Sequence, residues 1–447
     1  MTDAVEIRAI HARRVWDSRG RPTVEAEVHL HDGAVGSAIV PAGASKGTRE
    51  ALELRDGGER FGGLDVQRAV AHVNGEIARA VLGMAADDQA ALDERLIALD
   101  GTPNKARLGA NATLAVSMAA AHAAAASHGL PLYRYLGGDE ATLLPMPQIQ
   151  ILGGGAHAGR RVDIQDFMVV CPGARSFAQA LEWTAEVYRH AGLRMQARGS
   201  NAGVADEGGW WPAFGTNEEA LETLVAAIER AGFVPGEQVA IALDIAASDF
   251  GRGGRYRLGL ERRELDSDGL IELLLRWCER FPVASIEDPL AEDDPDAFAR
   301  FTRAVGHKLQ VVGDDFLVSD AALLRQAAAA GAANAVLLKP NQRGTLTETL
   351  QCWEMARELG YAGIVSARSG ESEDTTIVDL AIGWHAGQLK VGSFARGERM
   401  AKWNEALRIE ERLGSRARFA GAGVFGRNAV NPTQPAGGPT NASADPA

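Results

Sequence analysis

The chain has 447 residues, of which 46% are hydrophobic and 23% charged. This usage is ordinary for a globular protein and excludes wholesale disorder, and the length fits one large domain with a smaller one. There are 46 Lys and Arg against 59 Asp and Glu, a net charge of −13. We therefore expect no nucleic-acid partner, and an anionic substrate would need a local cluster of cations or a metal.

The cysteine content and the apolar runs predict a cytoplasmic protein that does not enter a membrane. The N-terminal segment mixes charges with its apolar residues, unlike a signal peptide. The longest apolar stretch, 110–127, is mostly alanine with interspersed polar side chains, which favours a packed helix over a membrane span. Three scattered cysteines without a CxxC pair argue for a reducing compartment: Cys171, Cys278 and Cys352.

The first part of the chain predicts a small α+β unit. Residues 5–45 contain three segments typical of strands, VEIRAI, PTVEAEVHLH and GSAIV, separated by turn sequences. Apolar residues at helical spacing then predict helices over 65–82, 87–99 and 110–127. Strands followed by helices suggest an N-terminal α+β cap domain, which we expect to occupy residues 1–138.

The second part predicts a parallel sheet, because short apolar strands alternate with amphipathic helices. The strand candidates are DFMVV, VAIALD, VASIED, LQVVGDD, NAVLLK, AGIVSAR and QLKVGS. Six of them end in a polar residue, and these residues lie 22 to 43 positions apart. Such a repeat favours a (β/α)8 barrel over 139–425, with its site at the carboxyl ends of the strands. The Pro/Gly/Asn-rich segment 426–447 is predicted to be a disordered tail.

Three acids end successive strands: Asp244, Glu287 and Asp314. A single Asp after a strand is usually a cap or turn residue. Three at one barrel rim would repel each other unless a cation lay between them, and oxygen ligands suit Mg²⁺. The sequence therefore predicts a magnesium site at this rim.

Basic residues end the later strands. Lys339 and Lys390 are candidates for a base whose pKa is lowered by the apolar rim and a metal, although a salt bridge to the rim acids is an equal alternative. Arg368 with Ser369 is a candidate anion clamp.

Glycine-rich loops over 41–50, 153–159 and 205–211 are candidate lids, and the last two carry His157 and Glu207. Each loop taken alone is as typical of a surface turn. No GxxxxGK[ST] nucleotide-binding signature occurs in the chain.

Ordered motifs over residues 5–422 resemble the enolase (phosphopyruvate hydratase) family. They are WDSRGRPTVEAEV, PAGASKG, ALELRDGG, GANATLAVSMA, HAGRRVDIQDFM, DEGG, LDIAASDF, SIEDPLAEDD, VVGDD, LLKPNQRGTLTET, SARSGESEDT and ARGERMAKWNEALRIEERLG. The resemblance implies an enolase-type (β/α)8 barrel with an N-terminal α+β capping domain, Mg²⁺, a small anionic phospho-substrate and a homodimer.

The resemblance also implies a role for each matching residue. Lys339 matches the base that takes the proton α to the substrate carboxylate, and Glu207 matches the acid that assists hydroxide departure. Asp244, Glu287, Asp314 and Ser45 match metal ligands. The substrate-binding positions are His157, Asp166, Arg368, Ser369 and Lys390.

Departures from the family pattern cluster on the substrate side. Ala367 stands where the family has histidine, Asp166 replaces a glutamate, Lys46 lies in the lid motif, and Gly153 replaces asparagine. A divergent enolase making phosphoenolpyruvate is one interpretation. An enolase-like paralogue that forms carboxyphosphonoenolpyruvate from a phosphoglycerate and CMP-activated phosphonoformate is another. A non-catalytic protein on the same scaffold is the third, and the intact ligand set argues against it.

Overall fold

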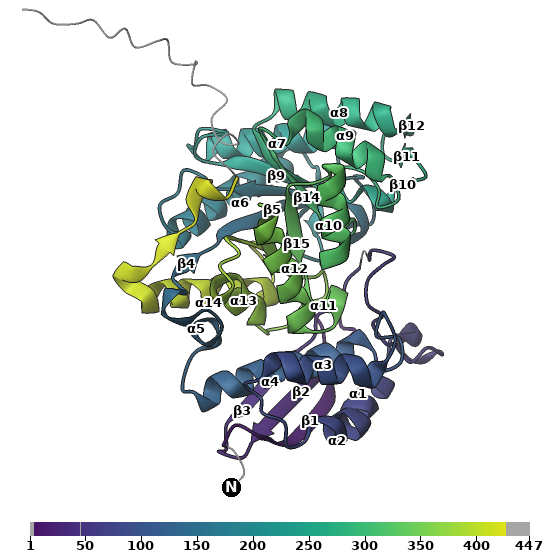
Figure 1. The fold of residues 1–447 in the computed structure, drawn as a ribbon. Coiled ribbons are helices and arrows are strands. Elements are labelled where there is room, and N and C mark those ends of the chain that lie inside the picture. Colours follow the sequence, from purple (N-terminus) through teal and green to yellow (C-terminus); the bar gives the residue numbers. More distant parts are fainter. Residues whose placement is uncertain (1–3, 45, 426–447) are drawn as a thin grey trace, which may run out of the picture.

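The computed structural model describes residues 4–44 and 46–425. An N-terminal α+β unit lies below a larger barrel in Figure 1, and helices α3, α4 and α11 lie between the N-terminal sheet and the barrel strands. The lid serine, Ser45, and the expected disordered tail, 426–447, fall outside the described residues.

The N-terminal sheet is an antiparallel meander of three strands in the order β1–β2–β3. The turn at Asp17–Arg21 closes the first hairpin, because the Asp17 carboxylate accepts hydrogen bonds from the backbone N–H groups of Arg19 and Arg21 at 2.9 Å each. Its strands are β1 (Ile7–Trp16), β2 (Pro22–Leu30) and β3 (Val35–Ile39).

The helix predicted over 65–82 is divided by a π-helical stretch, Val73–Ile77. The other two predicted helices lie close to their expected positions. The helices of this unit are α1 (Gln67–His72), α2 (Ala78–Val81), α3 (Gln89–Asp100), α4 (Ala110–Ser127) and α5 (Leu132–Gly137). Helix α4 is buried along nearly its whole length. None of the helices in the described part of the chain has the length and apolarity that crossing a membrane requires.

The second part of the chain forms a closed eight-stranded barrel. The strands follow one another in sequence order, and pairing of the last with the first completes the closure. They are β5 (Met146–Gly153), β6 (Asp166–Val170), β9 (Ala240–Asp244), β13 (Val283–Glu287), β14 (Gln310–Gly313), β15 (Ala335–Leu338), β16 (Ala362–Ser366) and β17 (Gln388–Ser393). The fold is therefore α/β, with the enolase-type barrel expected from the sequence.

Two features of the barrel differ from the sequence-based expectation. Strand β5 was not among the candidates, because buried Gln148 and Gln150 interrupt its apolar pattern. Strand β6 runs antiparallel to both of its neighbours, so the sheet is not wholly parallel. As a result, Asp166 begins its strand and still lies at the rim where β9 ends, paired in register with Asp244.

Helices surround the barrel (Figure 1). They are α6 (Phe177–Ala197), α7 (Asn217–Arg230), α8 (Ser267–Arg280), α9 (Pro295–Val305), α10 (Ala321–Ala330), α11 (Pro340–Arg343), α12 (Leu346–Glu358), α13 (Thr376–Gly383) and α14 (Gly397–Leu413). Several begin with a capping side chain; Thr216, for example, accepts a hydrogen bond from the Glu219 N–H. The short strands are β4 (Leu143–Leu144), β7 (Asn201–Val204), β8 (Trp210–Pro212), β10 (Gly251–Arg252), β11 (Arg255–Leu258), β12 (Arg263–Asp266) and β18 (Arg418–Phe419).

Candidate active site

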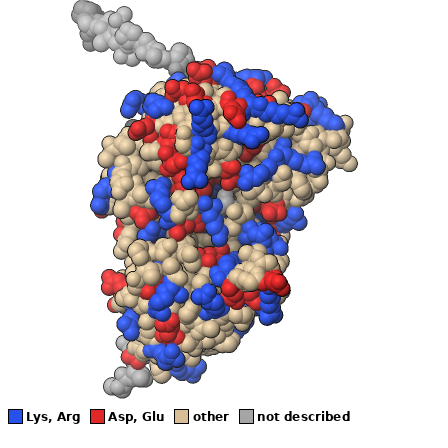
Figure 2. Space-filling model, turned by 90° about the vertical axis from the view of Figure 1, so that its right-hand side faces the viewer, with Lys and Arg blue, Asp and Glu red and all other residues tan. Residues whose placement is uncertain are grey.

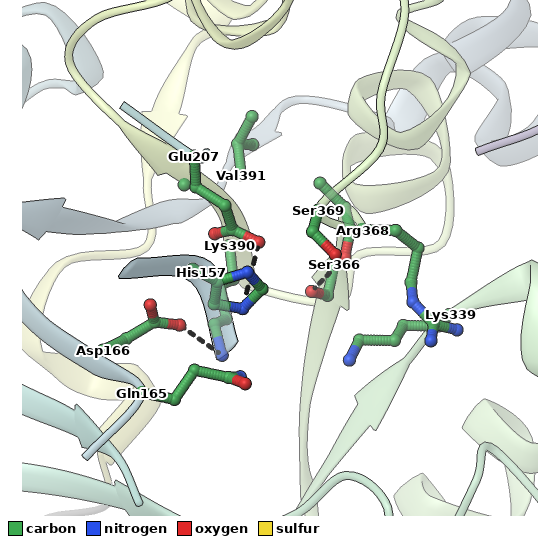
Figure 3. Close-up of a pocket in the computed structure, with 12 residues that line it drawn as sticks. His157, Gln165, Asp166, Glu207, Lys339, Ser366, Arg368, Ser369, Lys390 and Val391 are labelled. Atoms are coloured by element: carbon green, nitrogen blue, oxygen red, sulfur yellow. Dashed lines mark hydrogen bonds and ion pairs between the residues drawn. The ribbon is translucent and has the colours of Figure 1, made fainter. Parts of the chain in front are cut away.

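The predicted strand-end residues converge at one rim of the barrel. Asp244 and Glu287 are the last residues of β9 and β13, while Asp314 and Lys339 directly follow β14 and β15. Lys390 differs slightly from the prediction, because it lies inside β17 rather than at its end. In Figure 3, Asp166, Gln165 and Lys390 occupy one side of the pocket and Lys339 and Arg368 the other.

Lys390 joins the carboxylates on its side of the pocket. Its Nζ lies 2.7 Å from Asp244 Oδ2, 2.8 Å from Glu287 Oε2 and 3.4 Å from Asp166 Oδ2. Burial by itself lowers the pKa of Lys390, but these acids outweigh it and raise the pKa well above its usual value. The ammonium is therefore a fixed cation between the ends of three strands.

Lys339 is paired with Asp314, which also accepts a hydrogen bond from Gln342 Nε2 at 2.9 Å. The sequence suggested that the pKa of this lysine is lowered. In the structure, burial is the largest influence and lowers the pKa, but the neighbouring carboxylates, Asp314 foremost and then Glu287, together outweigh it, so the pKa lies above its usual value. This is the salt bridge that the sequence allowed as the alternative.

A second acidic group shares Asp314 and was not predicted as a metal site. Asp288, Asp314 and Asp315 each offer an oxygen within 4.8 Å of the others, and all three are buried. The two Asp288 oxygens accept hydrogen bonds from the backbone N–H groups of Asp314 and Asp315, at 2.9 and 2.8 Å. Asp288 therefore positions the segment that follows β14.

Arg368 lies on the Lys339 side of the pocket and is held by partners far away in sequence. Its guanidinium donates to Glu50 at 3.1 and 3.2 Å and to Asn341 Oδ1 at 2.9 Å. Ser369 Oγ accepts a hydrogen bond from the Ala44 N–H of the first glycine-rich loop at 2.7 Å. The candidate anion clamp is thus assembled between the barrel and that loop.

His157 and Glu207 meet at the other wall, with His157 Nε2 3.7 Å from Glu207 Oε1. Burial raises the pKa of Glu207, but His157 and the nearby Arg399 outweigh it, so the pKa lies below its usual value. Burial also raises the pKa of Asp166, to about 6, against the opposing effect of Lys390. On this wall Asp166 therefore holds a proton more strongly than Glu207 does.

Several residues that complete the site were not predicted. Gln165 lines the pocket, and its Nε2 donates to Asp244 Oδ2 at 2.9 Å. Gln150, Asn341 and Glu50 hold Asp166 and Arg368 in place. None of these four residues ends a predicted strand, so the strand-end pattern could not identify them. Gln165 alone stands next to a predicted site residue, Asp166.

Two of the departures from the family pattern are placed by the structure. Ala367 is 7% exposed and lines the pocket with a methyl group only. Lys46 pairs with Glu53 at 2.6 Å, and its side chain is nearly half exposed. Figure 2 shows basic side chains interleaved with acidic ones across the barrel part of one face of the molecule. The positive charge of Lys46 is thus paired with the Glu53 carboxylate.

The donor set at the rim fits a hard divalent cation. Glu287 Oε1 and Gln165 Oε1 are buried without a hydrogen-bond partner among the described residues. Carboxylate and amide oxygens are the ligands that such cations prefer. Lys390 Nζ contacts both Asp244 and Glu287, so the two carboxylates are close enough to bind one cation together.

Comparison with known proteins agrees with this architecture. Residues 7–136 match the family model "Enolase, N-terminal domain", and residues 141–428 match "Enolase, C-terminal TIM barrel domain". These two matches cover most of the chain, which therefore belongs to the enolase family, a family of lyases. Enolase 1 of Desulfitobacterium hafniense (strain Y51) is 50% identical over 426 residues, which cover 95% of this chain and 98% of the relative.

Proposed function

We propose that the protein dehydrates 2-phosphoglycerate to phosphoenolpyruvate in a Mg²⁺-dependent reaction. The observation that carries the proposal is the meeting of three strand-end carboxylates and two buried lysines around one pocket. The similarity to an enolase along nearly the whole chain supports the same reaction.

Asp244, Glu287 and Asp314 are the proposed metal ligands, with Ser45 of the lid loop for a second ion. We favour this set over Asp288 and Asp315 because both Asp288 oxygens already accept backbone hydrogen bonds. A bound Mg²⁺ would supply positive charge beside the substrate carboxylate and so make its α-proton more acidic.

Lys339 is the proposed base. It lies in the pocket across from Asp166 and Lys390, and it becomes a competent base once the proton held by the pair with Asp314 has passed to solvent, which leaves a neutral amine. Glu207, on the wall opposite Lys339 with His157, is the proposed acid: because its pKa is lowered in the free site, it first takes up a proton from solvent and then donates that proton to the departing hydroxyl group, which leaves as water. Arg368 and Ser369 bind the phosphate, while Lys390 and Asp166 orient the carboxylate end.

The test uses the ultraviolet absorbance of the enol product, followed with 2-phosphoglycerate at saturating Mg²⁺. Lys339→Met should lower kcat by at least about 100-fold, the contribution typical of a positioned base. Lys308→Met is the matched control, because Lys308 is exposed and lies outside the pocket. Absence of turnover by the unaltered protein, or equal rates for the two variants, would refute the proposal.

Ala367 favours a second candidate, in which the pocket takes a phosphonate co-substrate. A methyl group in place of a histidine removes a hydrogen-bond donor from the wall and is a smaller side chain. The corresponding reaction forms carboxyphosphonoenolpyruvate from a phosphoglycerate and CMP-activated phosphonoformate. Phosphorus NMR of the protein with both substrates distinguishes the two candidate reactions, since only the second gives a new phosphonate signal.

A further inference from the structure

Gln150 connects Asp166 to the loop that carries Glu207, on the wall of the pocket opposite Lys339. Its side chain, on β5, is fully buried inside the barrel. Its Nε2 donates to Asp166 Oδ1, and its Oε1 accepts a hydrogen bond from the Gly209 N–H at 2.9 Å. Gly209 ends the tight loop that carries Glu207, and the Gly209 carbonyl accepts from the Ala205 N–H at 2.8 Å. One amide group therefore contacts both a substrate-side carboxylate and the Glu207 loop.

The orientation of this amide is fixed by chemistry. A backbone N–H is only a donor, so the oxygen of Gln150 must face Gly209. The NH₂ group must then face Asp166, whose ionised carboxylate is only an acceptor. Reversing the amide would place donor against donor and acceptor against acceptor.

The space around the amide is equally restricted. A Cβ at Gly209 would lie 2.4 Å from Gln150 Oε1, and one at Gly153 would lie 3.2 Å from the same atom. Glycine at these two positions lets the Gln150 side chain extend between β5 and the loop. The Glu207 carbonyl is held from another strand, since it accepts a hydrogen bond from the Ser393 N–H at 2.9 Å.

We propose that Gln150 is a positioning residue, which fixes Asp166 and the Glu207 loop relative to each other. The inference rests on the proposed function, in which these two carboxylates act at opposite ends of the substrate. Asp166 is one methylene shorter than the glutamate of the family pattern. The Gln150 amide donates to this shorter carboxylate, which is thereby linked to the loop that carries Glu207.

Gln150→Asn tests the inference, because it keeps the amide but shortens its reach by one methylene. The matched control is Gln148→Asn, two residues earlier on the same face of β5. Gln148 is also a buried amide, but it donates to Gln388 Oε1 at 3.0 Å and not to Asp166. Both variants lose the same volume from the barrel interior.

The first readout is independent of activity. Hydrogen exchange of a peptide spanning residues 205–212 should be faster in Gln150→Asn than in the unaltered protein, because the Gly209 N–H loses its acceptor. The same peptide in Gln148→Asn should exchange at the original rate. Equal exchange in the two variants overturns the inference, whatever their activities.

The second readout is kinetic. Gln150→Asn should lower kcat/KM with 2-phosphoglycerate roughly 10- to 100-fold, the order expected when reacting groups are displaced by about 1 Å. Gln148→Asn should change it little. The double variant Gln150→Asn/Asp166→Glu returns the missing methylene on the carboxylate side, so it should be more active than the product of the two single effects.

The outcomes separate this inference from the proposed function. If the unaltered protein does not turn over 2-phosphoglycerate, the proposed function fails and hydrogen exchange alone decides the role of Gln150. If it does turn over, strictly multiplicative effects in the double variant overturn the inference and leave the proposed function standing.

Discussion

Ala367 is one residue of the pocket wall that departs from the pattern of the family that the sequence resembles. It is buried beside Arg368 and Ser366 and offers no polar atom to a ligand. A histidine here would add a hydrogen-bond donor close to the proposed phosphate site. The effect of this one side chain therefore distinguishes a weakened enolase site from a remodelled one.

Ala367→His should raise kcat/KM for 2-phosphoglycerate by roughly 10- to 150-fold, since a hydrogen bond to a charged group contributes about 1.5–3 kcal/mol. Steady-state kinetics at fixed Mg²⁺ measure it. Ala367→Leu controls for size, because it fills space without a donor. If the histidine variant is as slow as the leucine variant, the wall is shaped for another substrate.

At the scale of elements, Asp379 joins the N-terminal unit to the barrel. It lies on α13 and accepts a hydrogen bond from the Tyr133 N–H of α5 at 3.0 Å. Burial raises the pKa of Asp379 to about 7, with Glu405 and Asp374 adding to the rise and Arg412 opposing it. The carboxyl group is therefore protonated in the folded protein at a pH where the unfolded chain has lost the proton.

This difference predicts a loss of stability as the pH rises. Between about pH 4 and pH 7 the folded state binds more protons at Asp379, so raising the pH favours unfolding, by at most about 4 kcal/mol. Asp379→Asn should flatten this part of the stability profile in urea unfolding. Asp268→Asn, at an exposed carboxylate, should leave it unchanged; parallel profiles for both variants would contradict the prediction.

The contact between β3 and α4 depends on Gly36 of β3. A Cβ at Gly36 would lie 2.1 Å from Ala123 N and 2.2 Å from Ala119 O, both backbone atoms of α4. A helix and a strand can approach this closely only when the strand has no side chain at the crossing and the helix carries small ones. The alanine-rich sequence of α4 serves the same close packing.

Gly36→Ala should destabilise the protein by at least about 1–3 kcal/mol, because backbone cannot move aside as a flexible side chain would. Gly75→Ala is the matched control in the same unit. Gly75 is helical with nothing within 4 Å of an added Cβ, so alanine should raise stability slightly. Thermal unfolding measures both variants, and equal melting temperatures would contradict this account of the contact.

At the scale of the whole molecule, the rim connects strands that are distant in sequence. Ion pairs to Lys390 join β17 to β9 and β13, and Lys339 joins the end of β15 to that of β14. A cation bound by the same carboxylates would stabilise the closed barrel, since a ligand that binds only the folded state shifts the unfolding equilibrium.

Adding MgCl₂ to EDTA-treated protein should therefore raise the melting temperature. A free concentration of about 100 times Kd contributes about 2.7 kcal/mol. KCl at equal ionic strength controls for screening, and Glu287→Gln should reduce the Mg²⁺ effect. An unchanged melting temperature over the full Mg²⁺ titration would exclude binding at this site.

The local sequence pattern by itself determined most of the barrel strands and the positions of the rim acids. Periodicity predicted seven of the eight barrel strands, because a buried strand flanked by turns has a local signature. The rim positions of Asp244, Glu287 and Asp314 followed from the same reasoning, since parallel strands end at one edge. The ordered motifs then indicated the family and the residues of its site.

Only the tertiary structure decided how these residues are partnered. It reversed β6, so that Asp166 reaches the rim from the start of a strand, and it added β5 with its buried Gln150. It also paired Arg368 with Glu50 across 318 positions of sequence. Such pairings depend on which segments are neighbours in the folded chain, and a pattern within one segment carries no information about its neighbours in space.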